Sequence, residues 1–147
     1  MKTLLCILTV VCFVSIGCQS EQPTSSANTP FGTPEALAAA YMDAVEAKDG
    51  EALAGLTLWE GNIYMKEIQM SMAKSGLEDG LVSSTIGEVS ESQKQSYIDG
   101  QQRDGKTLVP NLPVSKILIV KTKTDLTIEH PIGFDGKRWW ITATVSK

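Results

Sequence analysis

Few side chains in this sequence could do chemistry, and histidine is the scarcest of them. His130 is the only histidine in 147 residues. It precedes Pro131 in a stretch of alternating apolar residues, where it could serve as a general base at the wall of a pocket, with a carboxylate such as Asp43 as its partner. The competing interpretation is a hydrogen-bonded or solvated histidine at the rim of a sheet. We favour that interpretation, and so assign no catalytic residue.

The composition gives less support to metal or nucleic-acid sites. One histidine and scattered carboxylates lack the spacing of metal ligands, so we expect no metal and no cofactor. The formal net charge is −4. A protein that binds a phosphate backbone needs a basic surface, and we therefore expect no nucleic-acid partner.

Four aromatic side chains are candidates for contact with a ligand. Tyr41, Trp59 and Tyr64 could line a pocket under the expected helices. Trp139 and Trp140 are adjacent, so on a strand they must face opposite sides. We expect one of them in the core and the other on the opposite face, where Trp140 is a candidate contact residue. Core filling is the competing interpretation for each of these residues, and we favour it.

An apolar leader ends at Cys18. The run from Thr3 to Ile16 carries no charge and follows Lys2. It is shorter than the roughly 20 apolar residues that span a bilayer, and it has the length of the apolar part of a signal peptide. Two of the three cysteines lie inside this run. The mature chain would therefore keep only Cys18 and could close no internal disulfide.

The segment Ser15-Ile16-Gly17-Cys18 resembles the lipobox of bacterial lipoprotein signal peptides. The resemblance implies that Cys18 is acylated, becomes the first residue after cleavage, and anchors the chain in the cell envelope. Gln19 then implies the outer membrane, if the cell has one. The alternative is cleavage by the ordinary signal peptidase, whose small-x-small rule Ser15 and Gly17 also satisfy, with secretion of a soluble protein. We favour the lipid anchor, because QSEQPTSSANTP follows and has the composition of a flexible tether.

Helices are expected first in the rest of the chain. Thr33, Pro34 and Glu35 form a helix start before the segment from 34 to 49. Its apolar stripe comprises Ala36, Leu37, Ala40, Tyr41, Ala44 and Val45. We expect a second short helix capped by Asp49 and a third over residues 62–75. The segment SESQKQSYIDGQQRDGK fits either a polar helix capped by Ser90 or an edge hairpin.

Strands are expected in the last third of the chain. The segments KILIVKTKT, LTIEHPIGF and KRWWITATV are rich in β-branched and aromatic residues. Asp135-Gly136 between the last two predicts a two-residue hairpin. Helices followed by an antiparallel sheet of at least three strands predict the α+β class.

The opening TPEALAAAYMDAVEAKDGEALAGL and the closing FDGKRWWI resemble the two ends of NTF2-like domains. The resemblance implies amphipathic N-terminal helices packed on a curved antiparallel sheet, with a conical pocket between them. The expected organisation is a signal peptide over 1–17, a lipidated cysteine and tether over 18–30, and an NTF2-like domain over 31–147. The family contains enzymes, binding modules and dimerisation domains, so the fold does not fix the function.

Two functions follow from these expectations. The first is a membrane-tethered envelope lipoprotein without enzymatic activity. Its domain would bind a small apolar ligand or an envelope protein, with a homodimer as a further option. The second is a small isomerase or dehydratase that uses the cone pocket with His130 and Asp43.

Overall fold

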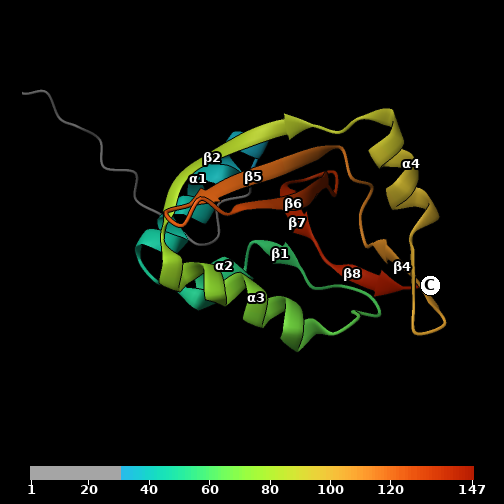
Figure 1. Ribbon diagram of the computed structural model, residues 1–147. Helices are drawn as coiled ribbons and strands as arrows, with labels where there is room; N and C mark the ends of the chain where they lie inside the picture. Colours follow the sequence, from blue (N-terminus) through green and yellow to red (C-terminus); the bar gives the residue numbers. More distant parts are fainter. Residues whose placement is uncertain (1–30) are drawn as a thin grey trace, which may run out of the picture.

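The computed structural model describes residues 31–147, apart from the side chains at positions 72, 73, 75–77 and 79. The expected signal peptide, Cys18 and the tether lie outside the described residues, as do the side chains of Met72 and Ala73. The described part is an α+β protein, which confirms the predicted class. It contains a five-stranded and a three-stranded sheet, with helices α1, α2 and α3 gathered near the larger one (Figure 1).

The first two helices begin where the sequence predicts. Helix α1 spans Pro34–Glu46, and the Thr33 hydroxyl accepts a hydrogen bond from the Ala36 amide at 3.2 Å. Helix α2 spans Gly50–Ala54 and is capped by the Asp49 carboxylate. The stripe of α1 differs from the prediction at one end, because Ala36 is exposed and Ala38 is buried in its place. The buried residues of α1 are Leu37, Ala38, Tyr41, Ala44 and Val45.

Helix α3 spans Lys66–Asp79, so the predicted range of 62–75 was wrong by four residues at each end. The residues before it pair with the end of the chain instead of starting a helix. Ile63 forms a bridge to Val145, and the Tyr64 amide donates to the Thr144 carbonyl at 2.9 Å. Met65 then adopts a left-handed backbone with φ of 52°, which separates this pairing from the helix.

The larger sheet has the strand order β1-β7-β6-β5-β2. These strands are β1 (Thr57–Leu58), β7 (Trp139–Thr142), β6 (Thr127–Phe134), β5 (Lys116–Thr122) and β2 (Leu81–Glu88). Strand β1 runs parallel to β7, and all other neighbours are antiparallel. The sheet is therefore mixed, which corrects the prediction of a purely antiparallel one. The chain leaving α2 enters β1 alongside β7, where the Ile141 amide donates to the Leu56 carbonyl at 3.0 Å.

The hairpin between β6 and β7 is longer than predicted. Phe134 pairs with Trp139, so the connection runs from residue 135 to 138 instead of covering two residues. The cause is the Asp135 side chain. Its carboxylate accepts hydrogen bonds from the backbone amides of Lys137 and Arg138 at 2.8 and 2.9 Å, and this arrangement holds the wider turn.

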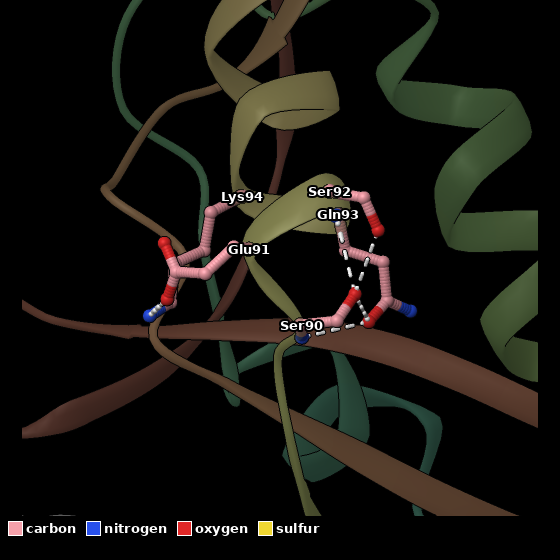
Figure 2. A network of polar contacts seen from close by, with 5 residues as sticks. All are labelled: Ser90, Glu91, Ser92, Gln93 and Lys94. Atoms are coloured by element: carbon pink, nitrogen blue, oxygen red, sulfur yellow. Dashed lines mark hydrogen bonds and ion pairs between the residues drawn. The ribbon is translucent and has the colours of Figure 1, made fainter.

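Both alternatives for the segment after Ser90 occur, one after the other. Helix α4 spans Glu91–Asp99, and Figure 2 shows its capping box, in which the side chains of Ser90 and Gln93 bond to each other's backbone amides. The hairpin of β3 (Gln101–Arg103) and β4 (Lys106–Pro110) follows directly.

The second sheet has the order β3-β4-β8, with β8 spanning Thr144–Ser146. The segment KRWWITATV, predicted as one strand, is divided between β7 in one sheet and β8 in the other. Ala143 lies at the crossing. Its amide donates to the Asn111 side chain at 2.9 Å and its carbonyl accepts from the Asn111 backbone at 3.0 Å. The backbone polar groups of the crossing residue are therefore satisfied by the loop before β5.

The main hydrophobic core lies between α1, α2 and the larger sheet. The largest fully buried side chains are Tyr41, Leu37, Leu53, Leu118, Ile132 and Val120. Tyr41 is the one member of this group with a polar atom, and its position leads to the candidate site.

Candidate functional site

A pocket of about 370 Å³ opens between the helices and the larger sheet. Side chains from α1, α2, α3, β6 and β7 line it, together with residues in and just after β1. Its wall is mainly apolar. Its lining residues include Tyr41, Trp59, Gln69, Leu126, Ile128, Glu129, His130 and Thr142.

Tyr41 and His130 form a hydrogen-bonded pair in the wall of this pocket. The Tyr41 Oη and His130 Nε2 atoms are 3.0 Å apart, and the ring centroids lie 5.1 Å apart with the rings tilted by 46°. Tyr41 comes from the buried stripe of α1, and His130 projects from β6 in register with Leu118. The histidine therefore faces the core side of the sheet, and its partner is a phenol.

Burial keeps both members of the pair uncharged near neutral pH. It lowers the pKa of His130 to about 4, because the charged imidazolium would lose its hydration. It raises the pKa of Tyr41 to about 12, because the phenolate would lose its own. The polar end of the pocket is thus a neutral pair that can donate and accept hydrogen bonds.

Trp59 and Gln69 shape another part of the pocket, and their polar groups are already bonded. The Trp59 Nε1 group donates to the Ala54 carbonyl at 2.7 Å, which fixes the ring beside α2. The Gln69 side chain donates to the Tyr64 carbonyl at 2.5 Å and accepts from the Thr144 amide at 3.3 Å. Trp59 therefore presents the face of its ring to the pocket, and Gln69 forms a part of the wall whose position is fixed by hydrogen bonds.

Asp43 does not join His130. It lies on α1 two residues after Tyr41, and residues at this spacing point to different sides of a helix. Asp43 is exposed and lines a separate pocket of about 550 Å³, together with Asp49, Glu51 and Arg138. The structure therefore does not bring together the acid and base considered from the sequence.

Tyr64 and Trp140 also lie away from the pocket lining. The Tyr64 hydroxyl donates to the Asp104 carboxylate at 2.7 Å, and this bond raises the pKa of Tyr64. Trp140 is buried, donates from Nε1 to Asp135 at 2.7 Å and is covered by the Arg138 guanidinium, whose carbon lies 3.4 Å from the ring centroid. Its indole is thus occupied by its own hairpin.

Of the sequence-derived candidates within the described residues, the structure brings together Tyr41, Trp59 and His130. Sequence reasoning missed the other residues of the pocket wall, among them Gln69, Ile128 and Thr142. Ile128 could have been found, since it precedes His130 by two residues on the same face of a strand. Gln69 and Thr142 carry no such signal, because their positions depend on where α3 and β7 meet.

Residues 31–147 contain no helix long and apolar enough to cross a membrane. Among the side chains that the structure describes in this range, no group of three or more His, Cys, Asp or Glu is placed to hold a metal ion.

Comparison with known proteins adds no assignment: no family model, no curated protein and no solved structure matches this chain. The function is therefore inferred from the geometry of the pocket and from the sequence.

Proposed function

We propose that this protein is an envelope lipoprotein that binds a small, mainly apolar ligand in the pocket formed by Tyr41, Trp59 and His130. In this proposal Cys18 carries the lipid, residues 18–30 form the tether, and residues 31–147 form an NTF2-like domain. The helices beside the larger sheet and the pocket between them support the NTF2-like assignment. The leader and the lipobox-like segment before Cys18 support the anchor.

The observation that carries the binding function is the hydrogen bond between Tyr41 and His130 in an otherwise mainly apolar wall. Ligand pockets commonly combine an apolar lining with a few polar groups that orient the ligand. A neutral phenol–imidazole pair suits an uncharged ligand with one polar group. An anion would have to leave water without meeting a positive charge from this pair.

The same pair argues against the alternative of an acid–base enzyme. A general base works best when its pKa lies near the operating pH. The pKa of His130 is about 4 and that of Tyr41 about 12, so neither group is matched to proton transfer at neutral pH. Asp43, the acid considered as a partner for His130, lines the other pocket. Binding is therefore the better-supported function.

Binding can be tested with the uncharged dye N-phenyl-1-naphthylamine on residues 18–147 carrying Cys18→Ser. Leu126 is 53% exposed at the pocket, so Leu126→Trp should narrow the entrance without disturbing the core. We expect it to weaken dye binding about tenfold, equivalent to about 1.4 kcal/mol. Phe134→Trp is the matched control, because Phe134 is 45% exposed at the far end of β6 and does not line this pocket. Equal effects of the two variants would contradict the assignment of the pocket.

The lipid anchor has a separate test. Cys18→Ser should remove the membrane-bound mature form and leave precursor or soluble protein, as seen by cell fractionation. Cys12→Ser changes a cysteine inside the leader and should leave the distribution unchanged. A processed Cys18→Ser chain that still sediments with membranes would exclude anchoring through this residue.

A further inference from the structure

The hydrogen bond between Tyr41 and His130 can be made in two ways. Burial lowers the pKa of His130 to about 4, so at neutral pH the imidazole carries a single ring proton. That proton lies either on Nε2, where it points at the Tyr41 hydroxyl oxygen, or on Nδ1, in which case the hydroxyl donates to Nε2. The position of the proton decides whether the histidine presents a donor or an acceptor to the pocket.

Burial and acidity both favour the bond in which Tyr41 donates. Tyr41 is 2% exposed, and among the described residues its hydroxyl has no other hydrogen-bond partner. If the hydroxyl accepted from Nε2, its own proton would be buried without an acceptor, which is costly. A phenol is also a stronger acid than the N–H group of a neutral imidazole, and the bare imidazole nitrogen is the more basic acceptor. The hydroxyl is therefore the donor of this pair.

The ring proton of His130 then lies on Nδ1, which is free to meet a ligand. Within residues 31–147, the hydrogen bond to Tyr41 is the only one that the His130 ring forms. The described side chains include no fully buried nitrogen or oxygen atom without a partner, so Nδ1 is open to the space beside it. His130 is half-buried and lines the pocket. The Nδ1–H group is thus an unused donor in a mainly apolar wall.

The other polar side chains of the wall do not supply an equivalent donor. Its indole and amide groups are bonded to backbone groups. The Thr142 hydroxyl donates to the Pro131 carbonyl at 3.1 Å. The Thr57 hydroxyl can either donate or accept, so it does not select between ligands. Glu129 precedes His130, and successive residues of a strand point to opposite faces. The polarity of the histidine therefore sets the polarity of the ligand.

We propose that the pocket selects an uncharged ligand whose polar group accepts a hydrogen bond and has no proton to donate, such as a ketone or an ester carbonyl, and that His130 Nδ1–H binds this group. Tyr41 is a positioning residue in this proposal, because its hydroxyl fixes the tautomer of the histidine. An alcohol could also accept from Nδ1–H, but its own proton would then face a mainly apolar wall. The inference rests on the proposed function and adds the class of ligand.

The tautomer can be measured directly, because His130 is the only histidine in the sequence. Long-range nitrogen–proton NMR spectra distinguish Nδ1–H from Nε2–H in residues 18–147 carrying Cys18→Ser, produced without a polyhistidine tag. We expect the Nδ1–H form at neutral pH. Tyr41→Phe removes the group that fixes the tautomer and should give a mixture of both forms. Tyr64→Phe is the matched control, because the Tyr64 hydroxyl bonds to Asp104 away from the pocket, and it should keep the Nδ1–H form.

A matched pair of ligands tests the ligand class. Cyclooctanone and cyclooctanol have the same carbon skeleton and differ only in the polar group. In displacement of N-phenyl-1-naphthylamine from the same protein, the ketone should bind about tenfold more tightly than the alcohol, equivalent to about 1.4 kcal/mol. The two ligands also differ in hydration, so their affinity ratio is compared between variants. Tyr41→Phe should lower this ratio about threefold or more, because the donor is then present in only part of the molecules, whereas Tyr64→Phe should preserve it.

The outcomes separate this inference from the proposed function. If neither the dye nor the two competitors bind, the proposed function is overturned and the ligand class with it. If they bind but the unsubstituted protein has the Nε2–H tautomer, or cyclooctanol binds as tightly as cyclooctanone, only the ligand class is overturned and the pocket remains a binding site. An affinity ratio that is the same in the Tyr41→Phe variant would overturn the positioning role of Tyr41.

Discussion

Two polar networks lie on strand β6 and its following turn, and they handle charge in opposite ways. Within the strand, burial lowers the pKa of His130 to about 4, so the neutral imidazole bonded to Tyr41 is favoured. At the turn, hydrogen bonds from the Arg138 amide, the Trp140 indole and the Lys137 amide lower the pKa of Asp135 to about 2, so the charged carboxylate is favoured. A lowered pKa thus removes charge from the first network and fixes it in the second.

The difference separates a candidate site from a structural turn. The hydrogen bonds of the Asp135 carboxylate go to groups of its own hairpin, and the indole that it orients is covered by Arg138. The Tyr41–His130 pair is joined by one bond and faces a pocket, so hydrogen-bonding capacity is left for a ligand. Three experiments test this contrast.

The largest effect should come from removing the buried phenol. Tyr41 is 2% exposed, and Tyr41→Ala should lower the free energy of unfolding by about 3–5 kcal/mol because it leaves a cavity beside His130. Tyr41→Phe keeps the ring and should cost about 1–3 kcal/mol, because only the hydrogen bond to the imidazole is lost. Urea denaturation measures both. Equal losses would mean that the hydroxyl, not the ring, dominates the contribution of Tyr41.

The next effect is a pH dependence. An unfolded histidine takes up a proton near pH 6.5, whereas folded His130 does so only near pH 4. The unfolded state therefore binds more protons between these values, and stability should fall as the pH falls from 6.5 to 4. The loss from this group is at most roughly 3 kcal/mol.

His130→Gln is the reference variant for this measurement, because glutamine does not titrate. The difference in unfolding free energy between the two proteins, followed across pH 4–7, isolates the histidine from the carboxylates that also titrate at low pH. A difference that stays constant across this range would show that His130 titrates normally in the folded protein.

The smallest effect is expected at the exposed network. Asp135→Asn keeps an oxygen that can accept from the turn amides but removes the charge. It should lower the melting temperature less than Tyr41→Phe does. The contribution of the Asp135 charge is present above pH 3.8 and should be lost as the pH falls towards 2. If Asp135→Asn lowers the melting temperature more than Tyr41→Phe does, the turn network contributes more to stability than the buried pair.

The sequence predicted the local elements of the fold well and the long-range ones poorly. The caps at Thr33 and Asp49 were identified correctly, and Ser90 caps the helix that was one of two alternatives for its segment, because a cap depends on a few neighbouring residues. Strand β1 was missed. It has only two residues, and its pairing with Ile141 comes from a part of the chain more than 80 positions away.

In the candidate site, too, local features were predicted and long-range contacts were not. Tyr41, Trp59 and His130 were singled out by residue type, but their association required the packing of α1 against β6, which no local pattern encodes. Asp43 was considered as a partner of His130 but lines the other pocket, for the same reason. Trp140 is buried, in line with the favoured interpretation, but its contacts with Asp135 and Arg138 could not be predicted, because the turn there is longer than the two-residue hairpin expected from the sequence.

The crossing at Ala143 also constrains the order in which the chain assembles. Strand β7 lies inside the larger sheet and β8 closes the smaller one, so neither sheet is complete without residues 139–146. A ribosome adding about 5–20 residues per second delivers these residues after every other described strand. Until β7 is synthesised, the larger sheet on which the helices pack is incomplete. Folding should therefore be a late, single event for both sheets, and any translocase or chaperone acting during synthesis would meet a chain without its core.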